Sequence, residues 1–124
     1  MGVHHKIRHT LGGSFNLPHS EVHTVILPHA LAYNAADAAE AMRAIGRALD
    51  PARRPELIEV PRALHGLARR IDAPMTLRDI GMDRADLDRA AELIVLTLYP
   101  NPRAIERHAI RALLQRAFDG ADPS

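Results

Sequence analysis

Residues 3–13 read VHHKIRHTLGG, with an apolar residue at every fourth position from the start. This spacing places the valine, isoleucine and leucine in one stripe along an α-helix. Two glycines follow the stripe, and glycine is typical of the position just after a helix ends. We therefore predict a short helix over residues 3–11 that ends at Gly12 and Gly13.

The same helical period extends over most of the chain, and no stretch has a defensible strand pattern. A second helix is predicted from His19 to Tyr33, and we expect Pro28 to bend it rather than end it, because the apolar spacing resumes beyond the proline. Pro61 is expected to begin a new helix, since proline is favoured in the first turn. Further predicted elements are helices at 38–49, 53–60, 61–71, 83–98 and 103–118, a helical cap at 76–81, and loops at 72–74 and 99–102.

The composition favours helices over sheets. Aromatic residues make up only 3% of the chain, whereas helix-compatible Ala, Leu and Arg are abundant. With 124 residues and 47% hydrophobic content, the chain is long enough to form one domain with its own core. We therefore predict an all-α fold, a helical bundle.

Charge and cysteine content argue against several functions. The net charge of +1 gives no general attraction to nucleic acid or to an anionic membrane. Because the chain has no cysteine, a metal site would use imidazole and carboxylate ligands. No apolar run approaches the roughly 20 residues that span a bilayer, and the first residues do not resemble a signal peptide. A cytoplasmic location is therefore expected.

Histidine is concentrated at the start of the chain. The pairs His5–His9 and His19–His23 are each four residues apart on predicted helices, so each pair shares one face, with Cβ atoms about 5–6 Å apart. The two pairs could meet across a cleft. The six histidines of this region are His4, His5, His9, His19, His23 and His29.

Such a cluster points to metal binding or proton transfer. Neutral imidazole is a common ligand for Zn²⁺ and Fe²⁺, and a histidine that is not a ligand can donate a proton near neutral pH. The alternative is that these are ordinary structural residues. Under that alternative, His4 is exposed and His23 is buried and bonded to a neighbouring helix. We expect His29, His65 and His108 to be structural or solvated.

Several motifs resemble the iron-containing alcohol dehydrogenase superfamily, and most closely its maleylacetate reductase branch. The run GVHHKIRHTLGG at residues 2–13 and the NLPH that follows at 16–19 form a specific pattern. The resemblance covers nearly the whole chain. Further matching stretches are LPHSEVH at 17–23, LPHALAYN at 27–34, LRDIGM at 77–82 and NPR at 101–103.

The resemblance implies a place for this chain within a larger architecture. In the superfamily, an N-terminal Rossmann-like domain binds NAD(P)H, and the active site lies in the cleft between it and a C-terminal helical domain. Residues 1–124 are expected to be that helical, metal- and substrate-side domain of the dehydroquinate synthase-like fold, with the nucleotide-binding domain missing. Gly12 and Gly13 read as a helix end and provide no phosphate-binding loop. The piece alone is expected to be inactive.

The resemblance also implies roles for individual histidines. In metal-dependent relatives, His5 and His19 match two ligands of Fe²⁺ or Zn²⁺, and the remaining ligands precede this segment. His9 matches a histidine near the substrate and the nicotinamide. His9 and His23 are the candidate catalytic acids for reducing the C=C bond of maleylacetate to 3-oxoadipate.

The segment from Tyr99 to Arg103 resembles a loop that approaches the cleft in relatives. Both of these residues are therefore candidate substrate-binding residues. Arg103 could pair with a substrate carboxylate or cap the final helix. A positive charge is disfavoured at a helix start, which slightly favours pairing with an anion.

Other functions and partners stay open from the sequence. The chain could belong to an iron- or zinc-dependent alcohol dehydrogenase, or be a non-enzymatic, His-rich, metal-binding helical module. The expected partner is a small-molecule dianion resembling maleylacetate, with no nucleic acid and no membrane. Two protein partners are compatible with the sequence: further copies of this chain in a homo-oligomer, or a separately encoded N-terminal half.

Overall fold

The structure is a computed structural model, and it describes residues 2–49, 59–96 and 99–124. These parts are helical and contain no strand, so the predicted all-α fold is confirmed. None of the helices within these ranges is long and apolar enough to cross a bilayer. The elements are α1 Val3–Ser14, α2 His19–Asn34, η1 Ala35–Ala38, α3 Ala39–Leu49, α4 Glu59–Arg70, η2 Arg84–Asp86, α5 Leu87–Val95 and α6 Arg107–Asp119.

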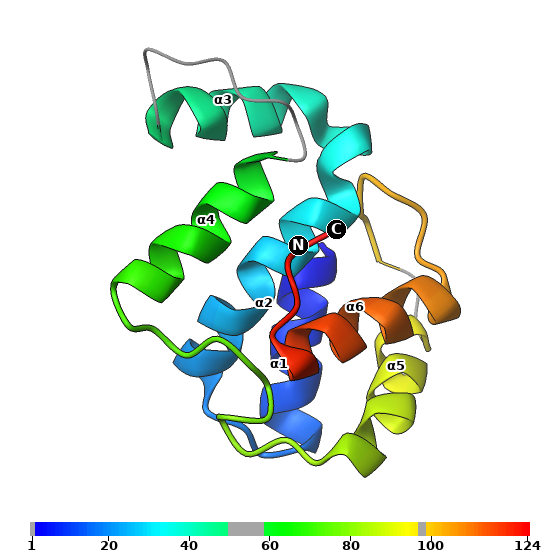
Figure 1. Ribbon diagram of the computed structural model, residues 1–124. Helices are drawn as coiled ribbons and strands as arrows, with labels where there is room; N and C mark the ends of the chain where they lie inside the picture. Colours follow the sequence, from blue (N-terminus) through cyan, green and yellow to red (C-terminus); the bar gives the residue numbers. More distant parts are fainter. Residues whose placement is uncertain (1, 50–58, 97–98) are drawn as a thin grey trace.

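Helix α2 lies at the centre of the fold (Figure 1). It packs against α1, α4 and α6, while α5 contacts both α1 and α6. Helix α3 lies at one end of the molecule, where it contacts η1 and α4. Helices α1 and α2, which carry the first six histidines of the chain, are therefore adjacent. Helix α5 packs against α1, and helix α6 packs against α2.

Apolar side chains of α1, α2, α5 and α6 form the main core. Their burial accounts for the helical spacing seen in the sequence, because each helix turns its apolar stripe inward. A much smaller cluster, formed by Ala35, Met42 and Val60, joins η1, α3 and α4. The large, fully buried members of the main core include Ile7, Leu11, Ile26, Leu87, Ile94, Ile110, Leu113 and Leu114.

The prediction that Gly12 and Gly13 end the first helix is wrong, because α1 continues through both. The chain turns at Asn16, whose φ of 55° is in the left-handed region that asparagine tolerates better than most residues. The Leu17 N–H then donates to the carbonyl of Leu11 at 3.2 Å, which satisfies one of the last carbonyls of the helix. The helix end is therefore set after the glycines.

Pro28 lies inside α2 and is buried, as the resumed apolar spacing predicts. The helix continues past the ring because apolar residues on both sides of it pack into the same core. The bend predicted at this proline stays a prediction. Beyond Asn34 the backbone tightens into η1 and continues directly into α3, so the Asn34 side chain caps nothing there and instead bonds Asn101.

Helix α4 begins at Glu59, which places Pro61 in its first turn. Proline is tolerated there because first-turn N–H groups have no partner within the helix. The predicted boundary between residues 60 and 61 is wrong, because Glu59 and Val60 belong to the same helix as Pro61. The helix expected just before it, at 53–60, lies mostly outside the described residues. Asp83 caps η2: its carboxylate accepts the backbone N–H of Ala85 at 3.1 Å.

The final helix begins later than predicted. Apolar spacing placed its start at Arg103, whereas α6 begins at Arg107. Long-range hydrogen bonds hold the preceding segment out of the helix, among them one from the Tyr33 hydroxyl to the carbonyl of Ala104. Arg103 is therefore not at a helix start, and the alternative in which it caps the final helix is wrong.

Candidate active site

Two histidines meet where α1 packs on α2. The ring centroids of His4 and His23 are 4.3 Å apart in an edge-to-face arrangement, and His4 Nε2 lies 3.3 Å from the His23 carbonyl oxygen. Burial lowers the pKa of His4, which favours its neutral form. This ring contact between α1 and α2 joins His4 to His23, a pairing that the four-residue spacings do not predict.

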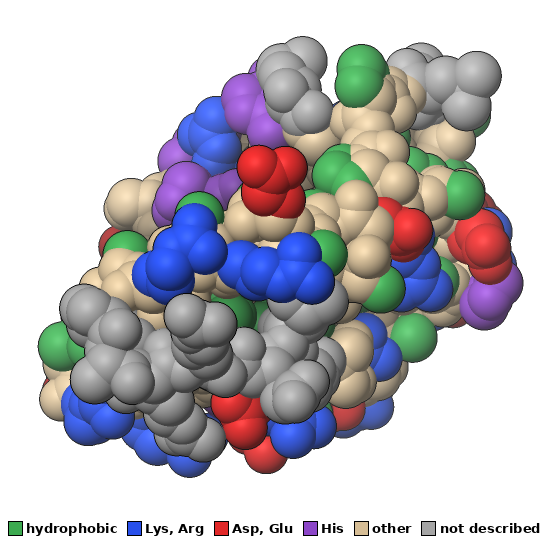
Figure 2. Space-filling model, turned by 90° about the horizontal axis from the view of Figure 1, so that it is seen from above, with side chains coloured by type: hydrophobic (Ala, Val, Ile, Leu, Met, Phe, Trp, Pro, Cys, Tyr) green, Lys and Arg blue, Asp and Glu red, His purple; other side chains and the backbone are tan. Residues whose placement is uncertain are grey.

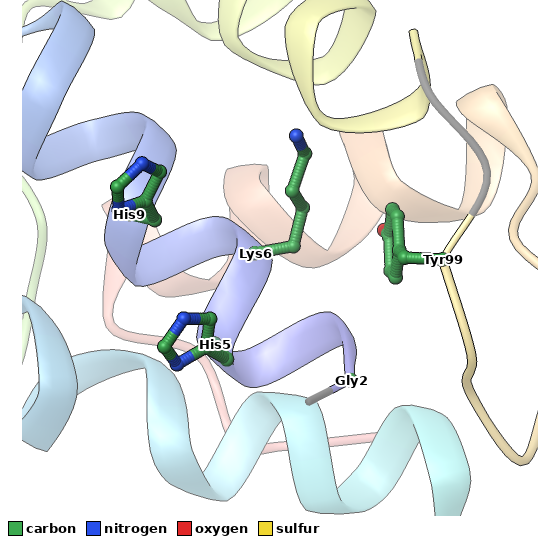
Figure 3. A pocket seen from close by; sticks show the side chains of 5 residues that line it. All are labelled: Gly2, His5, Lys6, His9 and Tyr99. Carbon is green, nitrogen blue, oxygen red and sulfur yellow. The ribbon is translucent and has the colours of Figure 1, made fainter.

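His5 and His9 share one face of α1, as their spacing predicts. Their rings are nearly parallel, at 7°, with centroids 6.3 Å apart. With Gly2, Lys6 and Tyr99 they line a pocket of about 230 Å³. Figure 3 shows Tyr99 reaching in from the loop after α5 and facing Lys6. The fold thus brings Tyr99 to the histidine pair from the other end of the sequence.

Tyr99 lines the pocket, while its hydroxyl oxygen is buried and has no hydrogen-bond partner among the described residues. Burial, with a smaller contribution from Tyr33, raises the pKa of Tyr99 to about 12. The phenol therefore keeps its proton near neutral pH. The Lys6 Nζ lies 6.0 Å from the centroid of the Tyr99 ring, at the outer limit of a cation–π contact.

Asn101 holds the loop that carries Tyr99. Its Oδ1 accepts the backbone N–H of Val3, the first residue of α1, at 2.9 Å. Its side chain also exchanges two hydrogen bonds with Asn34, at 2.7 and 3.1 Å, and donates to the carbonyl of Arg103 at 2.7 Å. Asn101 therefore fixes the start of α1 relative to the end of α2 and to the pocket loop.

Arg103 lies over the end of α2 and is not among the residues that line the Tyr99 pocket. Its guanidinium is 4.1 Å from the centroid of the Tyr33 ring, and its Nη1 donates to the Tyr33 carbonyl at 3.3 Å. The Tyr33 hydroxyl in turn accepts the Glu106 N–H at 3.3 Å. These contacts brace the loop against α2.

A second, more open pocket of about 470 Å³ lies beside the first turns of α2. It is lined by Arg8, His19, Ser20, His23 and Thr24. His19 and His23 are both exposed here, and the His19 ring also lies against the α1 backbone at Gly12. Figure 2 shows histidine side chains beside Lys or Arg at one edge of the molecule, so part of the cluster faces solvent.

Residues 1–118 match the family described as "Fe-containing alcohol dehydrogenase family, C-terminal". This match includes both pockets and every helix except the end of α6. The chain belongs to the iron-containing alcohol dehydrogenase family. The resemblance seen in the sequence motifs is thereby confirmed.

Maleylacetate reductases are among the relatives of this family member. That of Burkholderia cepacia is 54% identical over 124 residues, which are 100% of this chain and 34% of that protein. That of Pseudomonas sp. (strain P51) is 52% identical over 99% of this chain and 33% of that protein. The chain thus spans about a third of the length of these curated relatives.

Solved structures of the family share the fold. A putative alcohol dehydrogenase from Ralstonia eutropha JMP134 superposes with a TM-score of 0.92 at 55% identity, over 100% of this chain and 34% of that one. The maleylacetate reductase from Rhizobium sp. strain MTP-10005 gives 0.88 at 41% identity, over 99% of this chain and 33% of that one. The predicted fold, that of the family's C-terminal helical part, is therefore confirmed.

The described residues provide only part of a ligand set for an iron ion. Within residues 2–49, 59–96 and 99–124, no group of three or more His, Cys, Asp or Glu side chains could hold a metal ion. His5 and His19 are imidazole donors on adjacent helices, and imidazole suits Fe²⁺ and Zn²⁺. The donor chemistry of these two side chains suits such an ion, which would need further ligands.

The sequence patterns predict no role at this site for Lys6, Asn34 or Asn101. Lys6 directly follows His5, and a cation beside a histidine pair was an available signal. Asn34 and Asn101 end and begin two of the family-like stretches, but their mutual hydrogen bonds join residues 67 positions apart. No local pattern predicts such a pairing.

The remaining histidines are structural or solvated, as predicted. His29 is fully buried, and its ring centroid lies 5.8 Å from that of buried His65. Burial lowers the pKa of His29 to about 4, with His65 and Arg116 adding to the effect. His65 Nδ1 is 3.7 Å from a carboxylate oxygen of Asp122, while the side chain of His108 is 83% exposed.

Proposed function

We propose that this chain is the substrate-side helical domain of an NAD(P)H-dependent maleylacetate reductase, with a separate nucleotide-binding domain supplying the reduced cofactor. The observation that carries the proposal is the pocket in which His5, Lys6, His9 and Tyr99 meet. A wall with a cationic group and imidazoles suits a small dianion. Identities of 41–54% to maleylacetate reductases support this choice of substrate.

The reaction sets clear demands on the pocket. Maleylacetate carries two carboxylates and a C=C bond conjugated to a ketone. Hydride added to the carbon β to the ketone moves electron density onto the ketone oxygen, and a proton then joins the adjacent carbon to give 3-oxoadipate. The site therefore needs hydrogen-bond donors or a cation at the oxygen, and an acid near that carbon.

His9 is the proposed acid that supplies the proton. It lies on the pocket wall with His5 and Tyr99, where a bound substrate would contact it. His23 is the second candidate. The geometry favours His9, because the His23 ring contacts His4 and lines the other pocket.

Lys6 and Tyr99 are proposed to bind the substrate. Both residues line the pocket. The Lys6 ammonium would pair with one carboxylate, while the Tyr99 ring would pack against the substrate. Arg103 stays a candidate for the second carboxylate. Its contacts with Tyr33 favour a role in bracing the loop instead.

His5 and His19 are the proposed residues for Fe²⁺ or Zn²⁺, with further ligands from the nucleotide-binding domain. Such an ion, when bound, supplies Lewis acidity toward a substrate oxygen. In a metal-free member of the branch, the same two imidazoles would donate hydrogen bonds to a substrate carboxylate.

A chimera tests the proposal. The C-terminal third of the Burkholderia cepacia maleylacetate reductase is replaced by this chain, which is 54% identical to it over its full length. We expect the chimera to oxidise NADH in a maleylacetate-dependent manner. The isolated chain and the isolated N-terminal part serve as controls and are expected to be inactive separately, and mixing them tests reconstitution from two pieces.

Two outcomes would replace the proposal with another function. A folded, NADH-binding chimera that reduces simple aldehydes but not maleylacetate would indicate an alcohol dehydrogenase, in line with the 55% identity to the Ralstonia eutropha protein of that description. A chimera inactive on both, with an isolated chain that binds Zn²⁺ or Fe²⁺ tightly in a metal titration, would indicate a His-rich metal-binding module.

A further inference from the structure

A side chain at Gly12 on α1 would meet the ring of His19. A Cβ built at this position would lie 2.5 Å from Cε1, 2.7 Å from Nε2 and 2.9 Å from Nδ1 of His19. Side-chain Cβ atoms do not approach other atoms this closely. The His19 ring therefore lies in the volume that any residue other than glycine would fill.

The neighbouring Gly13 has no such contact. No atom lies within 4 Å of a Cβ built there, and the residue is exposed. Both glycines lie in the helix and neither has a positive φ, so the backbone conformation does not require glycine at either position. Glycine inside a helix is unfavourable relative to alanine, so close approach of His19 gives a reason for glycine at 12 and none at 13.

The position of Gly12 on the helix determines where His19 is placed. Gly12 follows His9 by three residues and His5 by seven, and these spacings put all three on one face of α1. We propose that Gly12 is the positioning residue that seats the His19 imidazole on the same face of α1 as His5 and His9. His23, one turn further along α2, meets His4 instead.

The functional consequence rests on the proposed function. If His5 and His19 act together on a metal ion or a substrate carboxylate, their rings must converge although they come from different helices. A side chain at position 12 would displace His19 from that face and leave His5 in place. Gly12 would thus act through His19, without itself touching the substrate.

The structural arm of the test uses the 124-residue chain and NMR of its histidine rings. We expect Gly12→Ala to shift the His19 ring resonances and to abolish the nuclear Overhauser contact between the His19 ring and residue 12, with helix content retained. Gly13→Ala, the matched control, should leave the His19 resonances unchanged. Unchanged His19 resonances in Gly12→Ala would overturn the proposal.

The functional arm uses the active chimera. Gly12→Ala is expected to lower kcat/KM by about 10- to 100-fold, the usual effect of removing a group that orients a ligand. It should have no further effect in a His19→Ala background, whereas general destabilisation would add to that variant. A Gly12→Ala chimera as active as its parent would refute the positioning role. If the unsubstituted chimera is inactive, the proposed function fails, and the NMR arm still decides the seating of His19.

Discussion

At the scale of single residues, His9 and His23 have the same side chain chemistry but lie in different environments. His9 lies on the wall of the Tyr99 pocket, whereas His23 contacts His4. In the chimera, we expect His9→Gln to lower kcat by at least about 100-fold, because a positioned general acid contributes on that order. We expect a much smaller loss for His23→Gln. Steady-state kinetics with maleylacetate would measure both.

His108 provides a matched control for these variants. Its side chain is 83% exposed, contacts Glu106, and lines neither the Tyr99 pocket nor the pocket beside α2. His108→Gln should therefore leave kcat unchanged. A loss in His23→Gln as large as that in His9→Gln would contradict the assignment of His9 as the acid.

Buried His29 should make the stability of the fold depend on pH. Burial lowers its pKa to about 4, while an unfolded chain has the ordinary value near 6.5. Between these values the unfolded state binds a proton that the folded state excludes, so stability is full above pH 6.5 and falls as the pH drops toward 4. The expected loss is about 3 kcal/mol.

Urea unfolding at a series of pH values would measure this loss, and an NMR titration of the His29 ring would give its midpoint directly. The pKa of His65 is also lowered by burial, so it should add to the same trend. His29→Leu should reduce the pH dependence, while the exposed His108→Gln should not. A His29 midpoint near 6.5 would contradict this account.

At the scale of elements, the start of α1 depends on a distant side chain. Asn101 accepts the Val3 N–H and pairs with Asn34, so it acts as an N-terminal cap supplied from another part of the chain. We expect Asn101→Ala to lower the free energy of unfolding by about 2 kcal/mol, the sum of a lost cap and lost partly buried hydrogen bonds. Denaturant unfolding would measure this change.

A surface hydrogen bond gives the comparison for Asn101. The Ser20 hydroxyl donates to the Glu21 carboxylate at an exposed site, at 2.9 Å. Ser20→Ala should therefore change stability by less than about 0.5 kcal/mol. Equal effects of Ser20→Ala and Asn101→Ala would mean that the asparagine network does not hold α1 to the pocket loop.

The helix boundaries show what a local pattern can and cannot predict. The four-residue spacing correctly placed α1, α2 and α3, because each buries its apolar stripe in a core. The same spacing failed at Arg103, where Tyr33 and Asn101 hold the backbone in a loop. The glycine signal failed at Gly12, because the sequence does not distinguish a glycine that makes room for a neighbouring ring from one that ends a helix.

At the scale of the whole molecule, the two apolar clusters differ greatly in size. The main core joins α1, α2, α5 and α6, whereas Ala35, Met42 and Val60 form the smaller one under α3. We expect amide hydrogens of α3 to exchange much faster than those of α2 and α6, because fewer buried contacts oppose local opening. Native-state hydrogen exchange would measure this difference.

Core truncations extend that prediction. Leu113 is fully buried in the main core, so Leu113→Ala should lower the free energy of unfolding by about 2–5 kcal/mol and raise exchange throughout the chain. Met42→Ala, made in the smaller cluster, should raise exchange mainly in α3 and α4. A uniform effect of Met42→Ala on all helices would show that the two clusters unfold together.

Local patterns in the amino-acid sequence predict the all-α class, most helices and the shared face of His5 and His9, because helical period and composition are local properties. The tertiary structure alone decided that His4 meets His23, that His19 rests on Gly12, and that Tyr99 closes a pocket beside Lys6. Each of these contacts joins different helices or loops. Their geometry depends on how the helices pack, which no spacing within one segment encodes.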